Sequence, residues 1–304
     1  MKGVERAARA LKDLDPHIGD LWLDQVHNDS LQRYRVARKH WAVGTLNRTL
    51  AVVRRILKLS AELWRDEQSG LTWLGVAPMI KLESKYKKRQ PYPLGWDEQV
   101  LLFPELAGHL QRMALFAVNT GARQEEICGL KWRWEQRVPE LDTPTVQRTV
   151  FVLPGSVTKN GEPRVLVLND VAQSVIEEVR REHRTYVFTY KDPHEVRNRV
   201  GRMNNKGWRG GRRRAAERYK KVLERECPNG FKRIRVHDLR HTFGRRLRAA
   251  GVSLEDRQDL LGHKSSRMTT HYSAAEIGNL LIAANLATKS RESPARTVLH
   301  VVGA

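Results

Sequence analysis

A basic run that ends in two prolines divides this chain. The segment KLESKYKKRQPYPLGW reaches Pro91 and Pro93, and a proline cannot continue a helix. The hydrophobic pattern before this run is helical, whereas the pattern after it mixes helical spacing with strand-like alternation. At 304 residues the chain is long enough for two moderate cores. The break predicts a helical domain over 1–80, a basic linker over 81–93, a second domain over 94–280 and a C-terminal tail over 281–304.

The excess of basic over acidic residues indicates what kind of molecule the protein binds. The chain has 55 Lys and Arg against 34 Asp and Glu, a formal net charge of +21 spread through ordinary globular sequence. Such an excess attracts polyanions and releases counterions on binding, so nucleic acid is the expected partner. A ribosomal or membrane-surface protein is the alternative that charge alone leaves open.

Cysteine usage and hydropathy indicate the compartment. Cys128 and Cys227 have no CxxC spacing, which favours a reducing compartment and argues against structural zinc. No apolar run approaches the length of a membrane span, and the start, MKGVERAARALKDL, does not resemble a signal peptide. We expect a soluble, cytoplasmic, nucleoid-associated protein with no membrane partner.

The first domain is predicted to be all helical. Its clearest helix is TLNRTLAVVRRILKLSAELW, where Thr45 can cap the start. The apolar stripe of this helix consists of Leu46, Leu50, Val53 and Leu57. The other face carries Arg48, Arg54 and Arg55, which we take as candidate DNA contacts; a merely solvated face is the alternative. The linker adds Lys85, Lys87, Lys88 and Arg89 as candidates along a phosphate backbone.

The second domain is predicted to be mainly α with a small antiparallel β-sheet. HLQRMALFAVNTGARQEEICGLKW reads as two helices with a Thr-Gly break. TVFVLPGSVTKNGEPRVLVLND predicts a β-hairpin turning at Asn160–Gly161. A helix at 171–183 and a short strand at 185–190 follow. Near the end, Ser253 and Asp256 form a capping box and Gly262 is a natural helix C-cap.

The stretch 206–248 is strongly basic and contains aromatic residues. We expect a DNA-lining face here, with Arg209 and Arg212 as candidate contacts, and a loop at KGWRGGRRR.

HDLRHTFGRRLRAAG places His237 and Arg240 on one side of a helix start. The apolar stripe of that helix is Leu239, Phe243 and Leu247. A helix N-terminus suits an anion such as phosphate. A metal on the histidines is disfavoured, because HExxH is absent and Arg240 lies between His237 and His241. Caps and surface contacts remain the structural alternative.

Further residues complete an inventory for phosphoryl transfer. Arg123 follows the helix break with Glu126 one turn later, Lys159 lies beside the hairpin turn, and His263 precedes Tyr272 by nine residues. Breaking a phosphodiester without a metal needs a nucleophile, donors to the phosphate oxygens and an acid for the leaving oxygen. A phenol, two guanidiniums, a lysine and histidines can supply these functions.

The ordered motifs TGARQEEICGL, VTKNGEPRVLVL, HDLRHTF, LLGHKS and MTTHYS resemble those of the tyrosine recombinases, or phage-type integrases. The resemblance covers roughly residues 93 to 280, and TLNRTLAVVRRIL is similar to the most recognisable helix of the family's core-DNA-binding domain. It implies that Arg123 and Arg240 clamp the scissile phosphate, Lys159 is the general acid and His237 the general base. His263 would hydrogen-bond the phosphate, Tyr272 would form a 3′-phosphotyrosyl intermediate, and Glu126 would be structural support. No cofactor, neither metal nor ATP, is implied.

The family architecture implies a C-shaped clamp of core-binding and α+β catalytic domains around duplex DNA. Recombination would need a homotetramer on two DNA sites, with accessory DNA-bending or excision factors possible. The apolar helix AAEIGNLLIAANLA after Tyr272 would dock on a neighbouring protomer; packing on its own domain is the alternative. Longer phage integrases carry an additional N-terminal arm-site domain, whereas this sequence begins almost directly with the core-binding region. We expect either that the protein works without an arm-site domain or that the start of the sequence omits it.

The function implied is integration or excision of a phage or other mobile element. A chromosome-dimer-resolving recombinase or a type IB topoisomerase is the alternative within the chemistry. A non-catalytic DNA-binding regulator is the alternative from another class.

Overall fold

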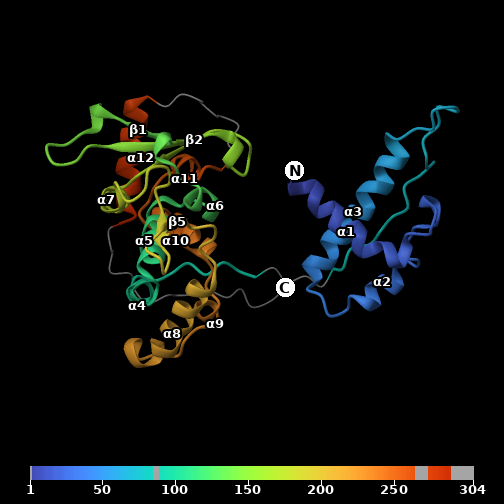
Figure 1. Ribbon diagram of the computed structural model, residues 1–304, viewed down its shortest axis with the longest axis horizontal. Coiled ribbons are helices and arrows are strands. Elements are labelled where there is room, and N and C mark those ends of the chain that lie inside the picture. Colours follow the sequence, from blue (N-terminus) through green and yellow to red (C-terminus); the bar gives the residue numbers. More distant parts are fainter. Residues whose placement is uncertain (1, 85–88, 264–272, 289–304) are drawn as a thin grey trace. The chain divides into compact units, whose positions relative to one another are not determined.

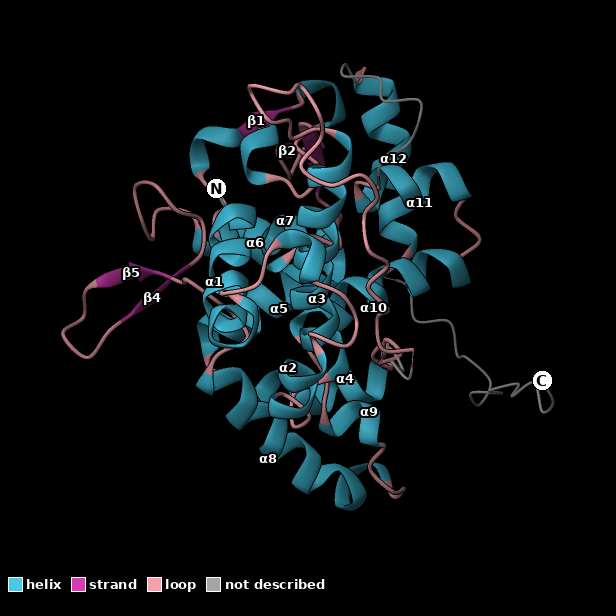
Figure 2. Cartoon of the chain, turned by 90° about the vertical axis from the view of Figure 1, so that its right-hand side faces the viewer, coloured by secondary structure: helices cyan, strands magenta, loops and turns pink. Residues whose placement is uncertain are grey.

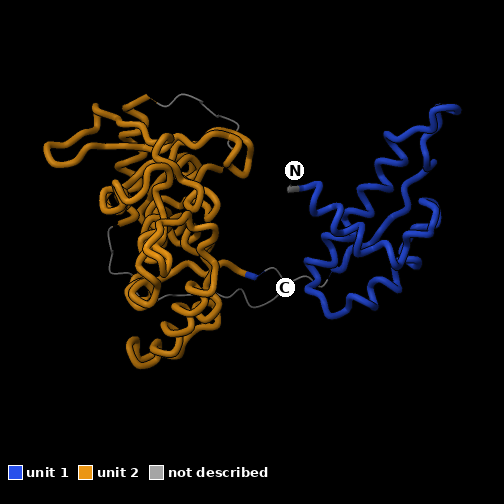
Figure 3. Tube along the Cα trace, in the orientation of Figure 1, with its two compact units in different colours: residues 1–89 blue, residues 90–304 orange. Residues whose placement is uncertain are grey.

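The chain forms two compact units, Met1–Arg89 and Gln90–Ala304, each drawn in its own colour in Figure 3. A computed structural model describes residues 2–84, 89–263 and 273–288. The division falls inside the segment 81–93, whose described residues form neither helix nor strand. Helices make up most of both units, and two small antiparallel sheets lie in the second (Figure 2), as the sequence predicts.

The first unit buries a small helical core. Its helices are α1 Lys2–Ile18, α2 Gln32–Ala37 and α3 Val43–Glu62 (Figure 1). The predicted apolar stripe of α3 is buried, which confirms its period. The predicted cap is wrong: α3 begins at Val43 after the extended residue Ala42, so Thr45 lies within its first turn.

The all-helical prediction for 1–80 is also wrong after α3. Residues 63–80 form turns and an isolated bridge between Arg65 and Thr72. Asp66 accepts from the backbone N–H of Ser69 at 2.7 Å, and Gly70 has φ +69. A side chain that bonds local N–H groups offers the backbone an alternative to helix.

The second unit packs helices around a large core. Its helices are α4 Trp96–Leu102, α5 Gly108–Thr120, α6 Gln124–Cys128, α7 Asp170–Val179, α8 Lys206–Leu223, α9 Asn229–Lys232, α10 Val236–Ala249, α11 Leu254–Leu261 and α12 Ala274–Leu286. Helix α5 is the central element and packs against both α7 and α10. The stripe Leu239, Phe243 and Leu247 of α10 is fully buried, as predicted.

The strands form two separate antiparallel sheets. Strands β1 Glu135–Arg137, β2 Thr149–Leu153 and β3 Arg164–Val167 form one sheet in that order. Strands β4 Thr189–Lys191 and β5 Arg197–Arg199 form the other. The predicted hairpin is confirmed as the β2–β3 pair, in which Leu153 faces Arg164. It is not a tight turn, however: the chain reverses over 154–163, and Gly161 takes φ +78 within that connection. Strands β1 and β5 were not predicted, and of 185–190 only the last two residues join β4.

The glycine-rich segment KGWRGGRRR is helical, contrary to the loop prediction. It opens α8, and the Asn205 side chain caps the helix by accepting from Trp208 N–H at 3.1 Å. A Cβ at Gly211 would lie 2.5 Å from the carbonyl oxygen of Glu105. This glycine therefore lets α8 pack closely on the chain beside it, and burial of Trp208 and Tyr219 outweighs its poor helix propensity.

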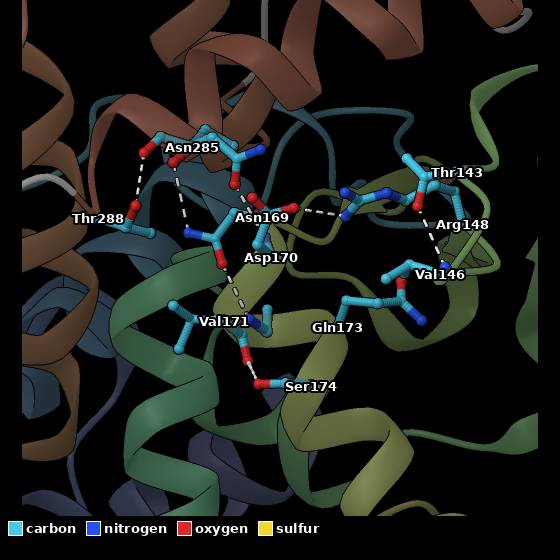
Figure 4. A network of polar contacts seen from close by, with 12 residues as sticks. Thr143, Val146, Arg148, Asn169, Asp170, Val171, Gln173, Ser174, Asn285 and Thr288 are labelled. Carbon is cyan, nitrogen blue, oxygen red and sulfur yellow. Dashed lines mark hydrogen bonds and ion pairs between the residues drawn. The ribbon is translucent and has the colours of Figure 1, made fainter.

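Helix α12 packs on its own unit. Leu280, Ala283 and Ala284 join a core cluster with Phe243 and Leu247 of α10. Figure 4 shows polar contacts that support this packing: the Asn169 amide donates to Ala284 O at 3.3 Å, and Asp170 N–H donates to the Asn285 side chain at 2.8 Å. This is the alternative to docking on a neighbouring protomer. The helix also runs through the predicted boundary at 280/281.

Candidate active site

A cleft of about 1090 Å³ in the second unit gathers residues from segments that are far apart in the sequence. Five of the six residues proposed for catalysis line it: Arg123, Lys159, His237, Arg240 and His263. They come from the start of α6, the β2–β3 connection, α10 and the residue following the C-cap of α11. The sixth, Tyr272, lies outside the described residues.

The turn between α5 and α6 positions Arg123. Gly121 ends α5 with φ +63, a conformation that favours glycine. Arg123 then caps α6: its N–H donates to Glu126 Oε2 and its Nη1 donates to Oε1, both at 2.8 Å. Its Nη2 reaches Gly262 O at 3.3 Å. Glu126 is 2% exposed, so the carboxylate that holds Arg123 is fixed within the core.

Arg240 is a buried cation suited to an anion. It is 6% exposed, and its Nη1 donates to Gly121 O at 2.6 Å. Within the described ranges it forms no ion pair. Burial chiefly lowers the pKa of Arg240, and the positive charges of Arg164 and Arg123 lower it further. A buried guanidinium in this state is stabilised by a bound anion such as a phosphate oxygen.

Burial and nearby positive charge favour the neutral forms of His237 and His263. His237 and His241, one turn apart on α10, meet edge to face with ring centroids 4.8 Å apart. Burial, then His241 and Arg240, lowers the pKa of His237. Burial, then Arg240 and Arg123, lowers the pKa of His263. Neutral imidazoles can accept a proton, as a general base must.

The end of α11 positions His263 in the cleft. Ser253 caps the start of this helix by accepting from Asp256 N–H at 3.0 Å, which is one of the two bonds of the predicted capping box. Gly262 ends the helix with φ +57, as predicted. His263 N–H donates to Gln258 O at 2.9 Å, which anchors the backbone of this residue at the helix end.

Lys159 is exposed in the β2–β3 connection. Thr158 beside it shapes the connection, because its hydroxyl donates to Glu162 O at 2.7 Å. Lys159 also lines the cleft, and an exposed, flexible ammonium can turn toward a bound substrate. As for metals, the described part of the chain has no group of three or more His, Cys, Asp or Glu placed to hold one.

Some cleft residues were missed by the sequence reasoning. Arg245, Arg248, Arg257 and Gln258 line the same cleft. Arg164 lies beneath it, 7% exposed, and bonds to Glu126. The sequence does contain a signal for Arg164. In β3, Arg164 and Leu166 are two residues apart and so point to the same buried face of the strand, where an apolar residue is usual.

None of the predicted DNA contacts that the structure describes lines this cleft. Arg48, Arg54 and Arg55 are exposed on α3 of the first unit, and Arg89 is partly buried. Arg209 and Arg212 line a separate hollow of about 710 Å³ with Arg213 and Lys232. Lys85, Lys87 and Lys88 lie outside the described residues.

Comparison with known proteins places the chain in a family. The family model described as "Phage integrase family" matches residues 102–277, more than half of the chain. The integrase of Salmonella phage P22 is 28% identical over 239 residues, 76% of this chain and 54% of that protein. A XerC-like tyrosine recombinase of Caldanaerobacter subterraneus is 26% identical over 205 residues, 58% of this chain and 48% of that protein. The chain thus spans about half the length of these curated relatives.

Solved structures share the fold. The Tn1549 transposon integrase in complex with transposon right end DNA aligns with TM-score 0.56 and 14% identity, over 96% of this chain and 90% of that one. A lambda integrase dimer bound to a core site aligns with TM-score 0.57 and 14% identity, over 97% of this chain and 75% of that one. The fold and the motifs in the cleft define a phage-integrase type of protein, and the chain belongs to the phage integrase family. No helix within 2–84, 89–263 or 273–288 is long and apolar enough to cross a membrane.

Proposed function

We propose that this protein is a site-specific tyrosine recombinase that cleaves and rejoins double-stranded DNA through a 3′-phosphotyrosyl intermediate. The observation that carries the proposal is the single cleft shared by Arg123, Lys159, His237, Arg240 and His263, whose segments are far apart in the sequence. Family membership supports it, as do structural neighbours that are integrases bound to DNA.

In the proposed reaction, the Tyr272 phenol oxygen attacks phosphorus and the bond to the 5′ oxygen breaks. Arg123 and Arg240 hold the two non-bridging oxygens, and His263 donates a hydrogen bond to one of them. His237 accepts the phenolic proton, and Lys159 gives a proton to the departing 5′ oxygen. A 5′ hydroxyl from a second strand then reverses the step. The covalent intermediate retains the phosphodiester's free energy, so the proposal includes no metal and no ATP.

The protein would integrate or excise a phage or other mobile element, acting in the cytoplasm on the nucleoid as a homotetramer on two sites, with accessory DNA-bending or excision factors. The cations of α3, the linker and α8 would contact the phosphate backbone, and the two units would close around the duplex as a C-shaped clamp. A chromosome-dimer-resolving recombinase is the second candidate within the same chemistry, and the similarity to a XerC-like tyrosine recombinase supports that chemistry.

A trapping experiment tests the chemistry. The protein is mixed in EDTA with sheared host DNA containing the element's junctions, denatured with SDS, and the attached DNA is sequenced. Adducts are expected from the native protein and none from Tyr272→Phe. Tight binding without an adduct would instead favour a non-catalytic DNA-binding regulator. Joined ends that map to one chromosomal site, rather than to element junctions, would favour the Xer-like role.

A further inference from the structure

A third arginine supports the candidate active site without lining its cleft. Arg164 opens β3 and its side chain is only 6% exposed. Its Nη1 donates to Glu126 Oε2, and its Nη2 donates to Leu260 O at 2.7 Å. None of the roles proposed above uses it.

The first bond ties β3 to Arg123. Glu126 Oε2 accepts from both Arg164 and the Arg123 backbone, while Oε1 accepts from the Arg123 guanidinium. Burial alone would raise the pKa of Glu126, but Arg164 and the bonds from Arg123 hold that pKa below its ordinary value. The carboxylate is therefore an ionised bridge between two guanidiniums.

The second bond ties β3 to the helix end that carries His263. Leu260 O belongs to the last turn of α11, whose carbonyls have no partner within the helix. A Cβ at Gly262 would lie 2.4 Å from Arg164 Nε and 2.5 Å from Cδ. Gly262 thus meets two needs: it takes φ +57, and it leaves room for the Arg164 side chain beside the residue that precedes His263.

Arg164 is also close to Lys159 in the sequence, since Lys159 lies five residues earlier, in the β2–β3 connection. We infer that Arg164 is a positioning residue for DNA cleavage: it holds the segments of Arg123, Lys159 and His263 in one arrangement and adds a fixed positive charge behind the scissile phosphate. This inference rests on the function proposed above.

The charge count supports this role. Arg123, Arg164 and Arg240 surround the single carboxylate of Glu126, which leaves an excess of two positive charges. A phosphodiester carries one negative charge, and its equatorial oxygens gather more as the attacking and leaving oxygens share phosphorus. Fixed charges aimed at that change stabilise the transition state more than the bound substrate.

The test uses the full chain and a matched control. Arg164→Met removes the charge and both bonds, whereas Arg164→Lys keeps the charge but lacks the planar fork that reaches two acceptors. Arg148→Met is the control: Arg148 is 13% exposed and pairs with Asp170 at 2.6 Å beside β2 (Figure 4). Arg148 is not among the residues that line the cleft. The readouts are DNA affinity and the adduct-forming rate at saturating nicked DNA that carries the trapped site.

We expect Arg164→Met to form adducts about ten- to hundredfold more slowly with unchanged affinity, because small misplacements of reacting groups have effects of this size. Arg164→Lys should fall between it and the native protein, and Arg148→Met should match the native rate. A native rate in folded Arg164→Met would overturn the inference, as would an equal loss in Arg148→Met. If Arg164→Met does not fold, folded Arg164→Lys decides: a reduced rate supports the inference and a native rate overturns it.

A second readout does not depend on cleavage. The groups facing His263 are Arg240 and His241 of α10, Arg123 and Arg164. Loss of the Arg164 charge should raise the pKa of His263, measured by NMR titration, while Arg164→Lys and Arg148→Met should leave it unchanged. An unchanged His263 pKa in Arg164→Met would overturn the inference. If the native protein forms no adduct, the proposed function fails and the cleavage role of Arg164 fails with it; if adducts form but the His263 pKa does not change in Arg164→Met, only the inference about Arg164 fails.

Discussion

At the scale of single residues, the cleft combines positive charge with histidines that resist protonation. Arg240 is buried with a backbone carbonyl as its bonding partner, and His237 and His263 lie beside it. Burial and neighbouring cations lower the pKa of both histidines for the same reason: a further positive charge is unfavourable there. A bound phosphate reverses this balance, so the histidines should report whether an anion occupies the site.

We therefore predict the outcome of two NMR titrations, one of the free protein and one of the protein bound to DNA. In the free protein, His237 and His263 should titrate below the ordinary histidine value of about 6.5, so both are neutral at pH 7. Saturating duplex DNA should move both pKa values upward, since a nearby negative charge favours the imidazolium. Resonances are assigned with His237→Gln and His263→Gln. Unchanged pKa values on DNA binding would contradict a phosphate site in this cleft.

At the scale of elements, the α5–α6 turn connects core packing to the cleft. Gly121 has φ +63, and a Cβ there would lie 2.7 Å from Phe243 and 2.8 Å from Leu261. Its carbonyl also accepts from Arg240. The turn must therefore be both left-handed and close to two helices.

The variant Gly121→Ala tests this turn, with Gly251→Ala as its control. Gly251 has φ +80 with nothing within 4 Å of its Cβ position, so alanine there should cost only the left-handed strain, about 1–2 kcal/mol. Gly121→Ala should cost about 1–3 kcal/mol more from overlap with Phe243 and Leu261. Urea unfolding measures both, and equal losses would show that the close approach does not matter.

Helix α12 gives a second prediction at this scale. Leu280 is 5% exposed in the unit's own core, whereas Ile282 is 65% exposed on the outer face. Leu280→Ala should lower the free energy of unfolding by about 2–5 kcal/mol. Ile282→Ser should change it by less than about 0.5 kcal/mol. Selective loss of tetramers on DNA in Ile282→Ser would locate the protomer contact on that outer face, while loss of stability there would contradict the packing seen here.

At the scale of the whole molecule, a net charge of +21 implies binding that weakens with salt. Each unit has its own core, so surface charges on α3 can be changed without disturbing the cleft unit. Arg54 and Arg55 are exposed, and neither is ion-paired within the described ranges.

We predict that the double variant Arg54→Gln, Arg55→Gln lowers the slope of log Kd against log salt by up to about 2, one for each lost phosphate contact. The control is Arg6→Gln with Arg9→Gln on α1, which removes the same charge from two exposed positions. Equal changes in both variants would assign the effect to net charge rather than to the α3 face. Fluorescence anisotropy with duplex DNA at several salt concentrations provides the measurement.

The sequence by itself determined the class of fold, the break into two parts and the set of candidate site residues. These follow from local physics: hydrophobic periodicity, prolines and glycines act over a few residues, and the ordered motifs supply the candidates for the chemistry. The helix caps at Ser253 and Gly262 were predictable from the sequence for the same reason. The helical state of KGWRGGRRR was not, because burial of Trp208 and Tyr219 outweighs local propensity. Only the tertiary structure decided that Arg164 reaches Glu126 and Leu260, and that α12 packs on its own unit. Such contacts join residues distant in the chain, and their partners exist only once the core has closed.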